Sequence, residues 1–173
     1  MFYSLIRKAI KAILEGKETK VEINENNLIA WLGKPKYTYT KVDEIDQVGI
    51  VNGLAYTQYG GDTMPIEVTY YPGKGELKLT GKLGDVMKES AISALSYVRA
   101  HAKELNIDVN LFKDNDLHIN VPEGAVPKDG PSAGVTISTA IISLLTNRQV
   151  KKEVGMTGEI TLTGLVFPIG GLK

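Results

Sequence analysis

Hydrophobic side chains recur along this chain at two spacings, one typical of helices and one of strands. Helical spacing, with apolar positions three and four residues apart, covers residues 2–14, 26–32, 85–105 and 131–146. Gly16 ends the first of these segments, and Gly33 with Pro35 ends the second. The last segment belongs to a run without any charged side chain, from 131 to 147, which predicts a helix that is buried almost all round.

Short runs of alternating apolar and polar residues occupy much of the remaining chain. They cover residues 20–23, several stretches between 46 and 81, and residues 116–121, 153–162 and 165–169. The turn sequences Gly60-Gly61-Asp62 and Pro72-Gly73-Lys74-Gly75 separate the runs between 46 and 81, so these runs are predicted to form hairpins. Together with the helices they predict an α+β fold with a hairpin-rich sheet and packed helices.

Composition and charge divide the chain into two parts. The 173 residues are 43% hydrophobic and carry zero formal net charge, which fits one medium domain with an appendage. Residues 1–42 hold eight basic and four acidic side chains, and residues 43–173 hold twelve and sixteen. This shift predicts a boundary near residue 42. No apolar run reaches membrane-span length, no signal-peptide core is visible and no basic nucleic-acid footprint occurs, so a cytoplasmic protein is expected.

The residue types present limit the chemistry that the chain can carry. There is no cysteine and there are two histidines, which largely excludes thiol chemistry and metal clusters, so we expect no metal site. No Gly-x-x-x-x-Gly-Lys motif occurs either, so ATP binding through a P-loop is not expected from this chain.

The segment from Pro127 to Gly134 places Ser132 at the start of the long uncharged helix. Pro131 suits a first helical position, and the first turn of a helix leaves backbone N–H groups unpaired. Those groups can stabilise the negative charge that forms when Ser132 attacks a carbonyl, or they can hold a phosphate. A simple helix-capping serine is the structural alternative. Ala133 and Gly134, which leave room above the serine, favour a nucleophile.

Two kinds of base are open to such a serine. His118 precedes it by fourteen residues on a predicted strand, but a triad also needs an orienting carboxylate, and no spacing singles one out. A lysine is the other solution, with its pKa lowered by about three units from about 10.4 through burial. His101 is most simply a solvated helix residue.

Several segments together resemble the proteolytic domain of Lon, the family of ATP-dependent serine proteases. They are Val121-Pro122-Glu123-Gly124-Ala125, Pro127 to Gly134, Met156-Thr157-Gly158-Glu159-Ile160-Thr161 and Pro168-Ile169-Gly170-Gly171-Leu172-Lys173, with upstream matches from Asp46 to Ser90. The resemblance implies a serine–lysine dyad with Ser132 as nucleophile. In the family pattern the dyad lysine falls two residues beyond Lys173. We therefore expect that this chain ends before the base and before the last part of the domain.

The resemblance also implies roles for further residues. Asp129, Gly130 and Pro131 lie in the active-site vicinity, with a turn as the structural alternative for Asp129. Thr157 matches a threonine that holds the dyad lysine, and Glu159 matches a glutamate of the active-site region. Their structural alternatives are a strand residue and a surface ion-pair residue. Tyr56, Gly60 and Gly61 are candidates for a substrate groove, with a hairpin bulge as the alternative.

Partners and cofactors follow from the same resemblance. Residues 1–42 resemble the end of the small helical subdomain of the AAA+ ATPase, so ATP and Mg²⁺ are expected only in the ATPase module of an intact enzyme. Protein substrates and a homohexamer are implied as well. Two other functions stay open: a non-catalytic scaffold or oligomerisation fragment, and a phosphate-binding domain like those of small-molecule kinases.

Overall fold

The computed structural model describes residues 2–17, 19–33, 45–57, 60–122 and 127–170. The chain forms two compact units, Met1–Tyr39 and Thr40–Lys173. The boundary expected near residue 42 lies in residues 34–44, outside the described residues. None of the described helices is long and apolar enough to cross a membrane.

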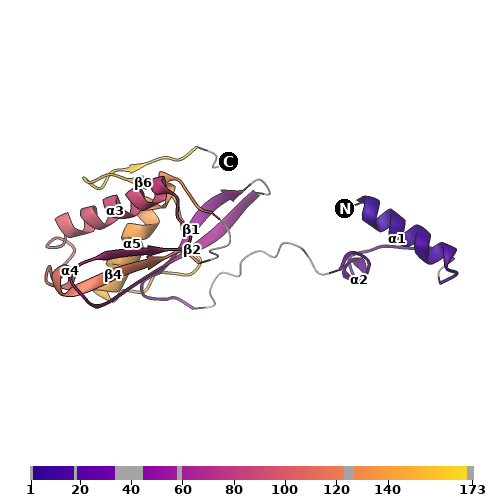
Figure 1. The fold of residues 1–173 in the computed structure, drawn as a ribbon, viewed down its shortest axis with the longest axis horizontal. Helices are drawn as coiled ribbons and strands as arrows, with labels where there is room; N and C mark the ends of the chain where they lie inside the picture. The colour runs from indigo at the N-terminus through magenta and orange to yellow at the C-terminus, as the bar shows by residue number, and fades with distance from the viewer. Residues whose placement is uncertain (1, 18, 34–44, 58–59, 123–126, 171–173) are drawn as a thin grey trace. The chain divides into compact units, whose positions relative to one another are not determined.

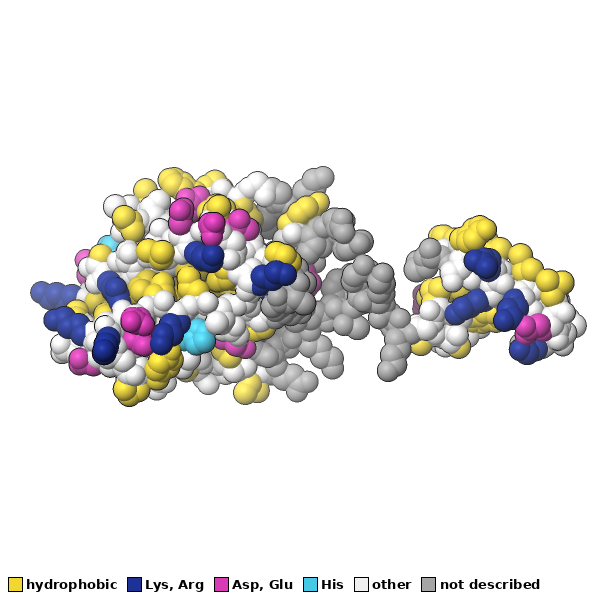
Figure 2. All heavy atoms as spheres, viewed as in Figure 1, with side chains coloured by type: hydrophobic (Ala, Val, Ile, Leu, Met, Phe, Trp, Pro, Cys, Tyr) yellow, Lys and Arg dark blue, Asp and Glu magenta, His cyan; other side chains and the backbone are white. Residues whose placement is uncertain are grey.

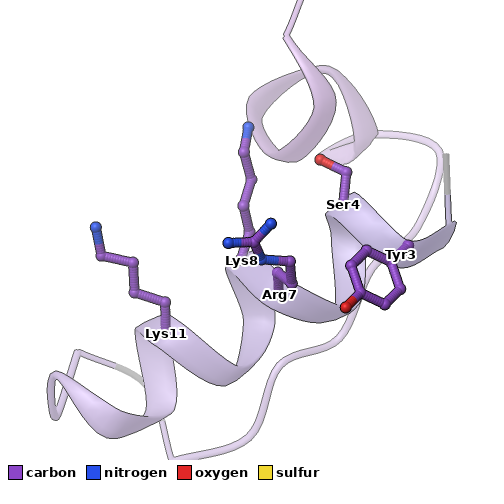
Figure 3. Close-up of a pocket in the computed structure, with 5 residues that line it drawn as sticks. All are labelled: Tyr3, Ser4, Arg7, Lys8 and Lys11. Atoms are coloured by element: carbon purple, nitrogen blue, oxygen red, sulfur yellow. The ribbon is translucent and has the colours of Figure 1, made fainter.

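The N-terminal unit contains α1 (Phe2–Leu14) and the short α2 (Leu28–Leu32). Lys8 Nζ donates a hydrogen bond to the Trp31 carbonyl at 2.7 Å, which links the two helices. Apolar side chains of α1 stay exposed beside basic ones, and Figure 2 shows both along this unit. A pocket on α1, drawn in Figure 3, is lined by Tyr3, Ser4, Arg7, Lys8 and Lys11.

The strand expected over residues 20–23 is wrong. Residues 21–24 have no regular secondary structure and pair with no strand within the described part of this unit. The side-chain amide of Asn27 instead donates to the Glu22 carbonyl at 2.9 Å, which closes a loop ahead of α2. A short run without a neighbouring strand cannot form a ladder, whatever its alternation.

The second unit is built on a five-stranded mixed sheet with the order β3-β4-β2-β1-β5. Its strands are β1 (Ile50–Thr57), β2 (Gly60–Pro72), β3 (Leu77–Thr80), β4 (Asn115–Asn120) and β5 (Gly155–Met156). β1 and β2 form a long antiparallel hairpin, and β2 pairs antiparallel with β4. β3 runs parallel to β4, and β5 parallel to β1. The α+β prediction is confirmed.

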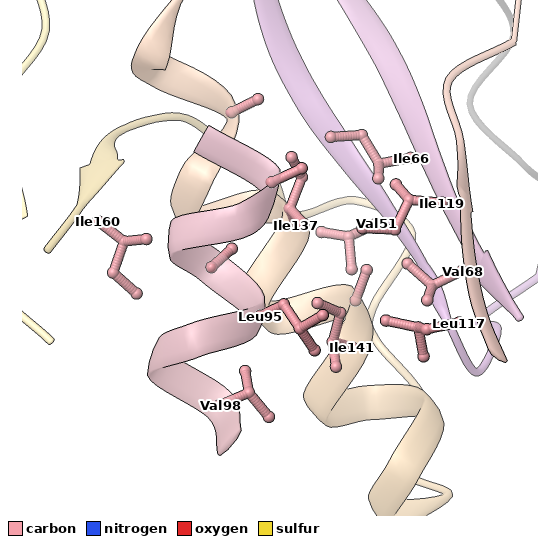
Figure 4. Packing of buried hydrophobic residues seen from close by; sticks show 14 of the residues in the cluster. Val51, Ile66, Val68, Leu95, Val98, Leu117, Ile119, Ile137, Ile141 and Ile160 are labelled. Carbon is pink, nitrogen blue, oxygen red and sulfur yellow. The ribbon is translucent and has the colours of Figure 1, made fainter. Parts of the chain in front are cut away.

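Two helices cover one face of this sheet, as Figure 1 shows: α3 (Asp85–Ala100) and α5 (Gly134–Thr146). A short helix, α4 (Leu111–Asp114), precedes β4. α5 packs on β1 and β2, while α3 packs on α5. No residue of α5 is exposed, so the prediction of a helix buried almost all round is confirmed. The core between helices and sheet contains Val51, Ile66, Val98, Ile119, Ile137 and Ile141, each at most 1% exposed (Figure 4).

The segment from 153 to 167 departs from the two strands expected there. The first is broken into β5 and β6 (Glu159–Ile160), and β6 forms a small antiparallel hairpin with β7 (Val166–Phe167). The break falls at Gly158, whose φ of +154° favours glycine and turns the chain toward the start of α5. Ile160 lies against the helices on the side away from the sheet (Figure 4).

The hairpin expected between β2 and β3 is also wrong, because β4 lies between them. The turn that follows β2 is held over β4 by Asp116, whose Oδ1 accepts the backbone N–H groups of Lys74 at 2.8 Å and Glu76 at 3.0 Å. Its Oδ2 lies 3.1 Å from Lys78 Nζ. These contacts place Leu77 opposite Leu117 of β4. The helix expected to reach residue 105 is regular only to Ala100, and turns follow it.

Asp116 generates a prediction about stability and pH. The Lys74 N–H above all, then the Glu76 N–H and the Lys78 ammonium, hold the pKa of Asp116 below its ordinary value. Stability from a lowered carboxyl pKa is present above the unfolded-state pKa, about 3.9, and is lost as pH falls through the folded-state pKa. Asp116→Asn should therefore lower the melting temperature at pH 7, and the difference from wild type should shrink below pH 4.

Thermal unfolding followed by circular dichroism at pH 7 and at pH 3 tests this prediction. Asp114→Asn is the matched control, because it removes the same charge from an exposed position two residues away. A difference between wild type and Asp116→Asn that stays constant from pH 7 to pH 3 would contradict the assigned role.

Candidate active site

Ser132 lies in a tight turn that leads directly into α5. Gly130, with φ of +128°, precedes the single 3₁₀ turn η1 (Pro131–Ala133), and Gly134 continues the helical path. The side chain of Ser132 is half-buried, and its hydroxyl has no hydrogen-bond partner among the described residues. The polypeptide on both sides of it is held by other segments.

The break between β5 and β6 holds the carbonyl side of Ser132. The Gly158 N–H donates to the Ser132 carbonyl at 2.7 Å, and the Val135 N–H donates to the Gly158 carbonyl at 3.0 Å. The hydroxyl of Thr157 lies 3.4 Å from the same Ser132 carbonyl. Of the predicted site residues, Thr157 is thus brought into direct contact with the backbone of Ser132.

Helix α3 holds the residues that precede Ser132. Asp129 Oδ1 accepts the Met87 N–H at 2.9 Å and the Gly130 N–H at 3.0 Å, so Asp129 caps the first turn of α3. Gly84 has no side chain where the Asp129 carboxylate lies: an added Cβ would approach it to 2.3 Å. The Ser90 hydroxyl donates to the Pro131 carbonyl at 3.0 Å.

The small residues after Ser132 serve close packing instead of leaving room above the serine. Ala133 is only 4% exposed. A Cβ on Gly134 would lie 2.9 Å from the Ile160 nitrogen and 3.1 Å from Ser90 Oγ. The expectation of open space at Gly134 is therefore wrong, because α3, α5 and β6 converge there.

The other predicted residues lie in different places. Glu159 is exposed on β6. Tyr56, 83% exposed, stands opposite Gly61 near the end of the β1–β2 hairpin, where Thr57 pairs with Gly60. His118 lies on β4 and shares a 2.9 Å hydrogen bond with Thr80 Oγ1, which gives it a partner within the sheet. Lys173, like the other residues of 171–173, lies outside the described residues.

Sequence reasoning missed two residues of this site, Ser90 and Gly158. Ser90 left a signal: it is a polar residue on the helical stripe formed by Met87, Ala91 and Ala94, and it is 8% exposed. Gly158 left only the Thr-Gly step inside an alternating run, which is compatible with a bulge as well as with a turn.

Comparison with known proteins assigns the arrangement to a family. Residues 22–173 match the Lon protease (S16) C-terminal proteolytic domain. The chain belongs to this family. Among similar proteins are the Lon protease of Bacillus thuringiensis (strain Al Hakam), 59% identical over 96% of this chain, and the Lon protease of Brevibacillus choshinensis, 58% identical over 98%. Lon protease 1 of Bacillus subtilis (strain 168) is 57% identical over 98%.

The chain spans about a fifth of the length of these relatives, 21% of the first and 22% of the other two. The match to the proteolytic domain begins at residue 22, inside the N-terminal unit. The family membership agrees with the resemblance found in the segments around Ser132 and Thr157.

The packing at Gly134 predicts that even one methyl group is costly there. In Gly134→Ala the new Cβ meets the backbone of Ile160, which cannot move aside as a flexible side chain would. We expect a loss of about 1–3 kcal/mol in the free energy of unfolding, measured by urea denaturation. Gly130→Ala tests the opposite situation, strain at positive φ with no atom nearby. An unchanged stability of Gly134→Ala would contradict the close approach of β6 to α5.

The cap formed by Asp129 gives a prediction that separates the effect of its hydrogen bond from the effect of its charge. Asp129→Ala should lower the free energy of unfolding by about 1 kcal/mol, because the Met87 N–H loses its acceptor. Asp129→Asn keeps an acceptor oxygen and should retain most of the stability. Urea denaturation of both variants measures this. Equal losses in the two variants would show that the carboxylate charge, and not the cap, matters.

Proposed function

We propose that this domain hydrolyses peptide bonds through an acyl-enzyme on Ser132. The observation that carries the proposal is the pinned turn: Ser132 stands between a peptide held by Ser90 and a peptide held by Gly158, with its hydroxyl unengaged within the described residues. A nucleophile needs a fixed backbone and a side chain that is free to reach the substrate. Membership of the Lon protease proteolytic family supports the same chemistry.

The negative charge of the tetrahedral intermediate requires donors near Ser132. We propose the backbone N–H of Ser132 as one of them, since neither η1 nor the neighbouring segments supply it with an acceptor among the described residues. A preorganised backbone donor does not have to reorient during the reaction, which is the origin of its effect on the rate.

We propose a lysine as the general base, two residues beyond Lys173 in the family's pattern. It would accept the proton of the Ser132 hydroxyl during attack and return it to the leaving amine. Neither histidine bonds to Ser132 within the described residues: His118 is bonded to Thr80, and His101 Nδ1 lies 2.9 Å from the Tyr97 carbonyl. We propose that Thr157, whose hydroxyl lies 3.4 Å from the Ser132 carbonyl, orients such a lysine.

We propose that an extended polypeptide substrate adds to β1. β5 pairs with this strand only at Asn52 and Gly53, and within the described residues no strand covers the same edge from Leu54 onward. Gly53 stands opposite Met156, so the open edge begins beside Thr157, which contacts Ser132. Main-chain pairing would hold many sequences with little selectivity. Tyr56, on β1 itself, would lie at the outer end of this edge, while Gly60 and Gly61 pair with Thr57 and Tyr56 from β2 on the other side of the strand.

The whole protein's further properties are proposals as well. We propose that an AAA+ ATPase module of the same polypeptide, using ATP and Mg²⁺, delivers unfolded proteins to this domain within a homohexamer in the cytoplasm. The support is the name that the relatives carry and the fifth of their length that this chain covers.

Cleavage of a fluorogenic peptide tests the proposed chemistry. Two proteins should be compared, the 173-residue chain and a chain extended through the end of the family's proteolytic domain, each with its Ser132→Ala variant. We expect activity in the extended protein and a loss of at least about a thousandfold with Ser132→Ala. Ser138→Ala, which removes a buried hydroxyl of α5, is the matched control. Activity that persists in Ser132→Ala would reject Ser132 as the nucleophile, and equal activity of both lengths would reject a base located beyond Lys173.

A further inference from the structure

Ser90 is a buried hydroxyl of α3 that the proposed chemistry does not yet use. It is 8% exposed, and its neighbours along the buried stripe, Met87, Ala91 and Ala94, are apolar. A buried hydroxyl costs free energy unless it finds a partner. The partner of Ser90 is the Pro131 carbonyl, 3.0 Å away and 41 residues along the chain.

The direction of this hydrogen bond differs from that of three other helical hydroxyls and is like that of Thr136, which donates to Met156 outside its helix. Ser96, Ser138 and Thr139 donate to carbonyls four residues earlier in their own helices, the usual local solution. Ser90 reaches across to the segment that carries the nucleophile. The close approach of Gly134, where a Cβ would lie 3.1 Å from Ser90 Oγ, leaves this hydroxyl directly against the turn.

The accepting carbonyl fixes the backbone of Ser132. The ring of Pro131 restricts its φ, so the plane of the 131–132 peptide depends on the remaining rotation, ψ of Pro131. Two donors hold that plane, the Ser90 hydroxyl and the Gly134 N–H. Because C=O and N–H point in opposite directions in a trans peptide, holding the Pro131 carbonyl against α3 directs the Ser132 N–H away from α3.

We propose that Ser90 is a positioning residue for the reaction: its hydroxyl holds the Pro131–Ser132 peptide in the orientation that presents the Ser132 N–H to the developing oxyanion. The inference rests on the proposed function. The Ser132 carbonyl on the other side is held by Gly158 and Thr157, so both peptides that flank the nucleophile have a partner outside the turn. Ser90 acts through Ser132 and touches no reacting atom.

The test is steady-state peptide hydrolysis by the full-length protein, with the fraction of reactive Ser132 counted by an active-site-directed phosphonate. Ser90→Ala should lower kcat per reactive site by about ten- to a hundredfold, less than the full loss of an oxyanion donor, with KM nearly unchanged. Ser138→Ala removes an equally buried hydroxyl from the same helix pair and should keep kcat within about twofold, because its acceptors lie at Gly134 and Val135.

The outcomes separate this inference from the proposed function. If wild type hydrolyses the peptide and Ser132→Ala does not, a kcat of Ser90→Ala equal to that of Ser138→Ala overturns the role of Ser90. If Ser90→Ala fails to fold, Ser90→Cys decides instead: its weaker donor should lower kcat per reactive site below that of wild type, by no more than about a hundredfold, and a wild-type kcat overturns the proposal. Wild-type protein without Ser132-dependent hydrolysis would reject the proposed function itself.

Discussion

The close contact at Gly134 is the constraint on which the active-site geometry depends. At this residue α5 begins, the backbone of β6 passes within van der Waals distance, and the hydroxyl of Ser90 arrives from α3. Only a residue without a Cβ allows all three to meet without displacement. The hydrogen bonds that hold Ser132, from Ser90 on one side and from Gly158 on the other, both follow from this convergence.

The sheet determines which segment meets α5 there. β5 pairs with β1 over only two positions, and the chain then leaves the sheet at Thr157 and Gly158. Thr136, fully buried on α5, donates a hydrogen bond from its hydroxyl to the Met156 carbonyl at 3.0 Å. This bond fixes Met156 as the point at which the chain leaves the sheet. A short β5 thus has two effects: it frees the chain to hold the Ser132 carbonyl, and within the described residues it leaves the edge of β1 beyond Gly53 without a strand, where the proposed substrate would add.

Local sequence patterns predicted which helices and strands form better than they predicted which strands pair with one another. The uncharged run after Pro131 predicted a buried helix correctly, because burial of an entire helix needs no knowledge of its neighbours. The placement of β3 beside β4 depends on Asp116, a contact over about forty residues that no local pattern reveals. The strand expected at 20–23 failed for the same reason, since alternation describes a face and not a neighbour.

In the candidate site, too, local sequence patterns identified residues, but contacts between distant segments could not be predicted. The motif around Ser132 singled out Ser132 as a candidate nucleophile and Asp129 as its neighbour, but the cap that Asp129 makes on α3 required the fold. Ser90 and Gly158 act through single hydrogen bonds to backbone carbonyls, and such bonds depend on where two distant segments meet. The proposal of a lysine base beyond Lys173 is supported only by the family's sequence pattern.

Covalent labelling is the most direct test of the central claim that this fold makes Ser132 a reactive nucleophile. The full-length protein is treated with a fluorophosphonate, and the modified residue is identified by mass spectrometry of its peptides. The account predicts one stoichiometric adduct on Ser132, formed with release of fluoride, and much slower labelling in Ser90→Ala, because the displaced backbone N–H no longer stabilises the negative charge on the phosphoryl oxygen in the transition state. A folded protein that forms no adduct, or that reacts at another serine instead, would contradict it.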